Sequence, residues 1–151
     1  MYSKILVPLD GSERAEAILP HVEDMARTYD STVIFMGIVE PEPAVLTPEP
    51  FYTSLDPELF QQRVAEVKNY LTAQQNKFLA KEINAKVYVS EGRVVEEIIA
   101  VAERESVDLI AMASHGRTGL SRVFYGSVAA GVLHRIDRPL LLIRSLDNGK
   151  P

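Results

Sequence analysis

Five short apolar runs are separated along the chain by segments that are each long enough to form a helix. The runs span residues 4–9, 32–39, 85–89, 107–113 and 139–144. Strands joined by helix-length crossovers pair in parallel, and a parallel sheet is covered by helices on both faces. The order β-α-β-α-β-α-β-α-β therefore predicts one α/β domain over residues 1–151, built as a doubly wound, five-stranded parallel sheet.

The segments between the runs repeat apolar residues every three or four positions, which is typical of helices with one buried face. In the first segment Pro20 interrupts this face, and an interior proline removes a backbone hydrogen bond. We therefore expect a kink or a break near Pro20. The next helix begins at Pro57, and the pattern predicts an inward face made of Leu59, Val64, Val67, Leu71, Phe78 and Leu79.

The connection over residues 41–57 holds five of the nine prolines of the chain, together with glutamate, threonine and serine. This composition predicts a loop, and its length exceeds that of an ordinary connection between a strand and a helix. Two interpretations are open: a mobile lid, or a solvated excursion over the surface, which is the commoner fate of a long loop.

The charge balance limits the classes of partner. The net charge is -5, whereas surfaces that bind nucleic acid or anionic membranes need an excess of basic residues. No apolar run approaches the ~18 residues of a membrane span, and the first residues lack the pattern of a signal peptide. We therefore expect a cytoplasmic protein that binds neither nucleic acid nor membrane. The absence of cysteine excludes disulfides, thiol catalysis and cysteine-based zinc sites.

The stretch over residues 107–128 runs from an apolar strand through a glycine-containing loop into an apolar helix. Gly126 and Ser127 open that helix, where unpaired backbone N–H groups and the positive end of the helix dipole favour an anion such as phosphate. Glycine turns and serine caps also occur in such loops when no ligand is bound. The stretch contains neither a Walker A motif nor GxGxxG, so any nucleotide site here belongs to another class.

Two loops are candidates for one shared site. In doubly wound sheets, ligands bind beyond the carboxyl ends of the strands, at the point where the strand order reverses. The first apolar run ends at Leu9 and Asp10, and the fourth ends at Ala113 and Ser114. If these two strands are neighbours, their loops face the same site.

The segments MYSKILVPLDGSE and VDLIAMASHGRTGLSRVFYGSVA give the chain a strong resemblance to the universal stress protein family over nearly its whole length. The resemblance implies a Rossmann-like sheet of the adenine nucleotide alpha-hydrolase-like type, with strand order 3-2-1-4-5. The nucleotide-binding branch of the family carries the pattern G-x2-G-x9-G-[S/T]. Gly116, Gly126 and Ser127 match its second half, whereas Ala113 occupies the position of the leading glycine. The resemblance therefore implies binding of ATP or AMP.

The same resemblance assigns a nucleotide site to the strand ends, the glycine loop and the last helix. On the strands it implies Pro8, Leu9, Asp10, Ile38, Val39, Met112 and Ala113. Ile38 and Val39 would lie against the adenine and the ribose, next to Gly37, which replaces a histidine often seen there. In the loop and the helix it implies His115, Gly116, Arg117, Gly119, Gly126, Ser127 and Val128.

Three of these residues admit more than one role. Asp10 would hold Mg2+ through water or bind the ribose, but it is equally suited to form the turn after the first strand or to cap the helix that follows. Arg117 would offset phosphate charge or remain solvated. His115 lacks the partners of a Ser-His-Asp arrangement, so we expect it to be structural. No catalytic residue is assigned, because no general base for hydrolysis stands out.

Three functions follow from these features. The first is a stress-response module that binds ATP or AMP and signals through nucleotide occupancy. Ala113 motivates a second, a nucleotide-independent dimeric interaction protein. A third, a slow ATP hydrolase or phosphotransferase, is motivated by the hydroxyl groups of Ser114, Thr118, Ser121 and Ser127. The apolar last strand, from Leu140 to Ile143, is expected at a sheet edge, where it would pair with its counterpart in a homodimer, as the resemblance also implies.

Overall fold

The strands and helices follow one another in the order expected from the sequence. The structure is a computed structural model, and it describes residues 1–41, 57–114 and 126–145. Its elements are β1 (Lys4–Pro8), α1 (Glu13–Glu16), α2 (Leu19–Tyr29), β2 (Thr32–Val39), α3 (Pro57–Ala80), β3 (Ala85–Glu91), α4 (Val94–Arg104), β4 (Leu109–Ser114), α5 (Ser127–Arg135) and β5 (Leu140–Arg144). Residues 42–56 of the proline-rich connection lie outside the described residues, so the two interpretations of that loop remain predictions.

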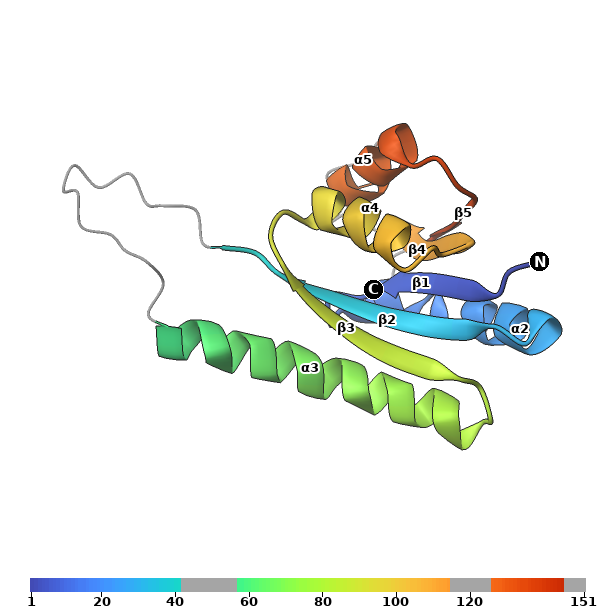
Figure 1. The fold of residues 1–151 in the computed structure, drawn as a ribbon, viewed down its shortest axis with the longest axis horizontal. Helices are drawn as coiled ribbons and strands as arrows, with labels where there is room; N and C mark the ends of the chain where they lie inside the picture. The colour runs from blue at the N-terminus through green and yellow to red at the C-terminus, as the bar shows by residue number, and fades with distance from the viewer. Residues whose placement is uncertain (42–56, 115–125, 146–151) are drawn as a thin grey trace, which may run out of the picture.

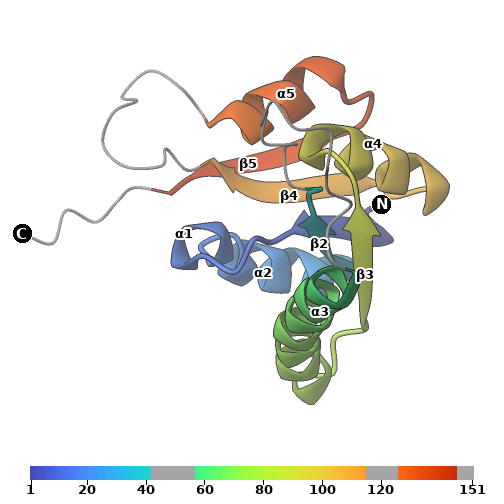
Figure 2. The same cartoon turned by 90° about the vertical axis from the view of Figure 1, so that its left-hand side faces the viewer.

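All five strands form one parallel sheet with the order β3-β2-β1-β4-β5. The doubly wound fold and the predicted strand order are therefore confirmed. Helices α1, α2 and α3 cover one face of the sheet, and α4 and α5 cover the other (Figures 1 and 2). The central strand β1 is buried on both faces through Ile5, Leu6 and Val7.

Side-chain alternation along the strands divides the core into two layers. Ile5 and Val7 belong to the layer that includes Val22 of α2 and Phe78 of α3. Leu6 points to the opposite face and packs in the layer that holds the buried side chains of α4 and α5. We call these the α1–α3 layer and the α4–α5 layer. In the first, Phe35 and Phe78 pack edge to face with ring centroids 4.9 Å apart, an arrangement that favours aromatic pairs.

The expected break at Pro20 is present. Helix α1 ends at Glu16, and Pro20 is the second residue of α2, where its missing N–H costs nothing because the first turn of a helix has no intrahelical acceptor for it. Two helices, α1 and α2, therefore form where the apolar spacing alone suggested one continuous helix.

Two of the core positions predicted for helix α3 are exposed in the structure. Leu71, Gln74 and Phe78 are its buried residues, whereas Leu59 is 42% exposed and Leu79 is 46% exposed. Successive residues of a helix are rotated by about 100°, so a face centred on Phe78 turns Leu79 toward solvent. Neither α3 nor any other helix within the described ranges is both long and apolar enough to cross a membrane.

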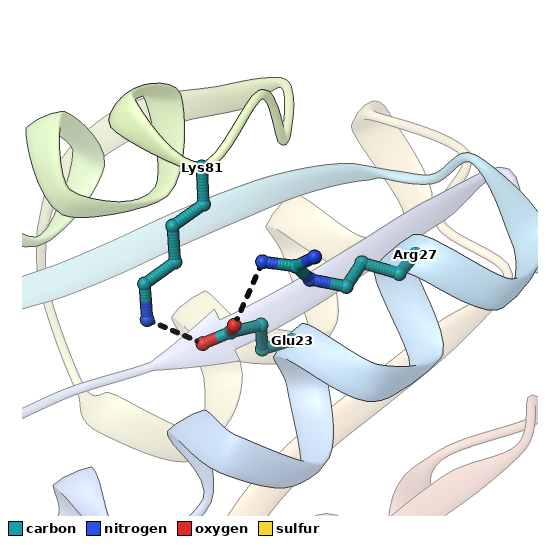
Figure 3. A network of polar contacts seen from close by, with 3 residues as sticks. All are labelled: Glu23, Arg27 and Lys81. Carbon is teal, nitrogen blue, oxygen red and sulfur yellow. Dashed lines mark hydrogen bonds and ion pairs between the residues drawn. The ribbon is translucent and has the colours of Figure 1, made fainter.

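A surface network links α2 to the chain that follows α3 (Figure 3). The carboxylate of Glu23 accepts hydrogen bonds from Nζ of Lys81 at 2.8 Å and from Arg27 at 3.1 Å. The hydrogen bond from Lys81 is the main reason why the pKa of Glu23 is lowered. Because Arg27 and Lys81 are solvent-exposed, their attraction to Glu23 is screened and contributes little to stability.

Candidate functional site

The candidate site lies where β1 and β4 run side by side in the middle of the sheet, as expected for the point where the strand order reverses. Their pairing is unusually short. Only Ile5↔Leu109 and Leu6↔Ile110 are register partners, whereas β1 pairs with β2 from Lys4 to Pro8. The two strands therefore stop pairing before β1 ends.

Pro8 explains why this pairing stops. Leu9 N–H donates to the Met36 carbonyl of β2 at 2.9 Å, so alternation turns the backbone groups of Pro8 toward β4. Ile110 N–H donates to Pro139 at 3.0 Å, on the side of β5, so the groups of Ala111 face β1. The next bond of the ladder would run from Pro8 to the Ala111 carbonyl, but proline has no N–H. The sequence thus ends the β1–β4 ladder at the carboxyl end of the sheet.

The turn after β1 is closed by its own side chains. Oδ1 of Asp10 accepts hydrogen bonds from the Ser12 N–H at 2.9 Å and from the Ser12 hydroxyl at 2.6 Å. Ser12 is the N-cap of α1, and its Oγ accepts the Ala15 N–H at 3.1 Å. Asp10 therefore performs the turn-forming role that was one of its two expected roles. Among the described residues, no group of three or more metal-ligating side chains accompanies it.

A polar contact between helices also holds α1 in place. The Tyr70 hydroxyl of α3 donates to Oε2 of Glu16 at 2.7 Å. Burial raises the pKa of Tyr70, and the hydrogen bond to the Glu16 carboxylate and its negative charge raise it further. Tyr70 therefore stays protonated over the physiological range and keeps this donor. The sequence patterns did not single out Tyr70 or Glu16, because the two residues meet only in the folded chain.

The start of α5 differs from the start of α1. Gly126 is its N-cap, with φ +69° and ψ 142°, a conformation that side-chain-bearing residues rarely adopt, and no side chain of a described residue caps this helix. The first helical bond runs from Ala130 N–H to the Gly126 carbonyl at 3.0 Å. The N–H groups of Ser127, Val128 and Ala129 consequently have no intrahelical acceptor. No acidic residue lies in this first turn, whereas His134 and Arg135 lie in the last, so the exposed end is suited to an anion.

The strand residues of the candidate site are divided between the two faces of the sheet. Ile38 is half-buried and packs, like Val128, against the α4–α5 layer, to which Met112 belongs. Leu9 and Ala113 belong to the α1–α3 layer. Val39 follows Ile38 and therefore points to the other face, and its carbonyl accepts the Gly92 N–H at 3.2 Å. Ile38, Met112 and Val128 thus share the α4–α5 layer, whereas Leu9 and Ala113 share the α1–α3 layer.

Ala113 and Gly37, the two departures from the family pattern, both have structural surroundings. Ala113 is a regular strand residue that pairs with Ile143, and its methyl group is buried in the layer opposite α5. At Gly37, a Cβ atom would overlap the Val67 side chain and lie 3.0 Å from Cδ1 of Leu71. Helix α3 packs against bare backbone there, which leaves no room for a histidine side chain.

The remaining candidates are distributed as follows. His115, Gly116, Arg117 and Gly119 lie outside the described residues. Ser114, one of the hydroxyl groups that suggested a hydrolase, is 4% exposed and donates to the Ile143 carbonyl at 3.3 Å. Its hydroxyl group therefore has a structural role between β4 and β5.

Comparison with known proteins agrees with the fold and identifies the family. A family model for the universal stress protein family matches residues 1–144. Universal stress protein MJ0577 of Methanocaldococcus jannaschii is 33% identical over 156 residues, covering 95% of this chain and 96% of that protein. Its solved structure gives a TM-score of 0.80 at 32% identity, with 95% of this chain and 96% of that chain covered.

Two further solved structures extend this likeness. Universal stress protein UspA from Lactobacillus plantarum gives a TM-score of 0.77 at 26% identity, covering 95% of this chain and 98% of that one. A universal stress protein from Archaeoglobus fulgidus, solved in complex with dAMP, gives a TM-score of 0.65 at 16% identity, covering 94% and 98%. The last likeness concerns the fold alone. The match of the family model and the 33% identity to MJ0577 together establish that this chain belongs to the universal stress protein family.

Proposed function

We propose that this protein binds an adenine nucleotide, ATP or AMP, at the carboxyl ends of β1 and β4, and that nucleotide occupancy is the signal it passes on in the stress response. The observation that carries the proposal is the uncapped start of α5 at Gly126 and Ser127. It lies on the connection that leaves β4, the strand whose pairing with β1 stops short. A universal stress protein from Archaeoglobus fulgidus with the same fold was solved in complex with dAMP, and the ligand class proposed here is the one bound by that relative.

The phosphate groups would lie at the start of α5. Three backbone N–H groups without intrahelical acceptors point along the helix axis at this end, and the helix dipole adds a partial positive charge. Gly126 has no side chain to keep an oxygen away from this backbone, and the exposed Ser127 hydroxyl is available as a further donor. Gly116 would contribute from the loop, as the family pattern implies, and Arg117 would offset phosphate charge there.

The adenine and the ribose would lie toward β2. Ile38 is half-buried at the carboxyl end of that strand, in the same layer as Met112 and Val128. An apolar surface of this kind suits the face of a base, because burying it removes apolar area from water. Pro8, Leu9, Asp10 and Val39 would border the site from the neighbouring strand ends.

Mg2+ enters the proposal only together with ATP. Asp10 would contact the ion through water, since its Oδ1 already holds the turn through two bonds from Ser12. When bound, the ion would neutralise part of the phosphate charge. The proposal assigns no hydrolytic step to this chain.

The experiment begins with the protein as purified. Denaturation should release any retained small molecule for identification by mass spectrometry, and the stripped protein is then titrated with ATP and AMP, with and without Mg2+, by calorimetry. We expect an adenine nucleotide in the released fraction and saturable one-site binding. Absence of both would contradict nucleotide binding and favour the nucleotide-independent interaction protein. Phosphate release above a heat-killed control in a single turnover would instead favour the slow hydrolase.

Assembly is a separate part of the proposal. Strand β5 lies at an edge of the sheet, and its residues from Leu140 to Ile143 are only half-buried. An apolar edge strand with unpaired backbone groups is prone to associate, and pairing with the same strand of a second copy would cover it. We propose a homodimer through this strand. Light scattering at micromolar concentration should give twice the mass of one chain, and a monomeric mass would contradict the proposal.

A further inference from the structure

One half-buried carboxylate lies beside the proposed base-binding side of the site and belongs to none of the residues discussed above. Glu97 is in the first turn of α4, and its side chain folds back over Gly92 at the end of β3. Its Oε1 lies 2.6 Å from the position that a Cβ atom would take at Gly92. The carboxylate is therefore held at the carboxyl edge of the sheet and does not extend into solvent.

Two contacts place this carboxylate next to the end of β2. Ser90 is the register partner of Ile38, and its hydroxyl donates to Oε2 of Glu97 at 2.7 Å. Gly92, over which Glu97 lies, donates its N–H to the Val39 carbonyl. Ile38 and Val39 are the residues proposed to lie against the nucleoside. Glu97 thus lies at the end of β3, which is one strand further than β2 from the proposed phosphate position at α5. This is the side of the sheet where the base would lie.

The two carboxylate oxygens of Glu97 differ in their hydrogen bonds. Oε2 accepts the Ser90 hydroxyl, whereas Oε1 accepts no hydrogen bond from any residue that the structure describes. A carboxylate oxygen can accept more than one hydrogen bond, so Oε1 retains full capacity for a donor. Its neighbour Glu96 behaves differently, because it is exposed and pairs with Arg135 of α5 at 3.2 Å.

We propose that Glu97 is a specificity-determining residue that accepts a hydrogen bond from the exocyclic amino group of adenine. The inference rests on the proposed nucleotide function. A ligand whose phosphates lie at α5 would present its base, rather than its phosphates, toward β2 and β3, because these strands lie on the opposite side of β1 from β4. Adenine presents an amino donor where guanine presents a carbonyl acceptor. An acceptor-only carboxylate therefore pairs with adenine and repels guanine.

The alternative role of Glu97 is purely structural. A carboxylate in the first turn of a helix interacts favourably with the positive end of the helix dipole, and this would stabilise α4 with no ligand present. That role predicts a change in stability on substitution but no change in the ratio of affinities for two bases. Base preference therefore separates the two roles.

The test compares Glu97→Gln with Glu96→Gln in the full chain. Both substitutions remove one negative charge from the same helical turn, but only the first changes the group that is bonded to Ser90, the register partner of Ile38. Calorimetric Kd values for ATP and GTP give the adenine preference of each variant, and thermal unfolding gives its stability. We expect Glu97→Gln to lower the preference for ATP over GTP by about 10- to 100-fold, the range of a lost hydrogen bond to a charged group. Glu96→Gln should leave the preference unchanged.

A third variant tests how the carboxylate is positioned. Ser90→Ala removes the donor that fixes Oε2, so the adenine preference should fall by a smaller factor than in Glu97→Gln. If the wild type binds ATP and Glu97→Gln keeps the same preference, the role of Glu97 is overturned while the nucleotide function stands. An equal change in the adenine preference of Glu96→Gln would overturn it as well, because any loss of negative charge from this helical turn would then have the same effect. A wild type that binds neither nucleotide overturns both proposals.

Discussion

The connections that leave β1 and β4 start from neighbouring strands, but the helices they lead to begin in different ways. At α1, Ser12 caps the helix and is itself held by Asp10, so side chains of the turn satisfy the local backbone. At α5, Gly126 provides no cap, and the first-turn N–H groups remain without an intrahelical acceptor. Among the residues that the structure describes, side chains cap the start of α1, which we call closed, and none caps the start of α5, which we call open.

In the proposed function, this difference separates a structural turn at α1 from a phosphate-binding position at α5. A capped helix start has few donors left for a ligand, whereas an uncapped start leaves its donors available until an anion or water satisfies them. The backbone conformation of Gly126 also departs from that of an ordinary N-cap, which has a negative φ like Ser12 at -84°. The α5 start therefore lacks the side-chain cap that stabilises α1.

The largest expected effect comes from Gly126→Ala. A methyl group at φ +69° forces the helix start out of its conformation, and such strain costs about 1–3 kcal/mol. Urea denaturation should give this loss in the free energy of unfolding. Ser127→Ala, one residue later and exposed, is the matched control and should change stability by less than about 0.5 kcal/mol. Equal losses in the two variants would show that Gly126 is not conformationally required.

Ser12→Ala tests the closed helix start. It removes the cap on Ala15 N–H and one of the bonds to Asp10, and loss of an N-cap costs about 1 kcal/mol. The same Ser127→Ala variant again serves as the control, because Ser127 follows the N-cap and makes no cap bond. Chemical denaturation of the pair should therefore separate a serine that caps its helix from one that does not. A Ser12→Ala variant as stable as the wild type would contradict the description of α1.

Tyr70→Phe tests the link between α1 and α3 and adds a pH dependence. Loss of the hydrogen bond to Glu16 should lower the free energy of unfolding by about 1 kcal/mol near neutral pH. Because the pKa of Tyr70 is raised in the folded state, its contribution is fully present below the unfolded tyrosine pKa of about 10. It is lost as the pH rises through the higher folded value. The stability difference between wild type and Tyr70→Phe should therefore shrink in alkaline solution, and a constant difference up to pH 11 would contradict the assignment.

The smallest expected effect is on the free energy of unfolding, when a negative charge is placed at the start of α5. Ser127→Asp places a carboxylate at the positive end of the helix and should raise the free energy of unfolding by about 0.3–1 kcal/mol in the absence of nucleotide. Ser127→Asn has nearly the same shape without the charge and should gain less. Thermal unfolding at low ionic strength is the suitable measurement, because salt screens the interaction. A destabilised Ser127→Asp variant would mean that negative charge is already concentrated at this end.

The elements of this fold follow closely from sequence periodicity, whereas contacts between distant segments do not. The run over residues 32–39 became β2 with the predicted bounds, because it is apolar and rich in β-branched residues. Pro20 was a sufficient signal for the break between α1 and α2. The predicted inward positions of Leu59 and Leu79 were wrong, because spacing alone does not fix which of two adjacent faces of α3 meets the sheet.

The candidate site was predictable in part for the same reason. Local signals identified Asp10 as a turn or cap residue after the first strand, and Gly126 as the start of a helix. The register between Ser90 and Ile38, and the fold of Glu97 over Gly92, depend on how β3 and α4 pack, and no local pattern distinguishes Glu97 from an ordinary first-turn acid. The end of the β1–β4 ladder at Pro8 likewise needed the observed register, although proline itself was visible in the sequence.

The most direct test of the open helix start is a calorimetric titration of ATP with Mg2+ into the wild type, Ser127→Asn and Ser127→Asp. If the phosphates lie at the start of α5, Ser127→Asn should bind within a few-fold of the wild type. Ser127→Asp should bind at least about 10-fold more weakly, because a carboxylate and a phosphate would compete for the same N–H groups, even though this variant is the more stable protein without ligand. Equal Kd values for the two variants, with normal binding by the wild type, would place the phosphates elsewhere and contradict the central claim.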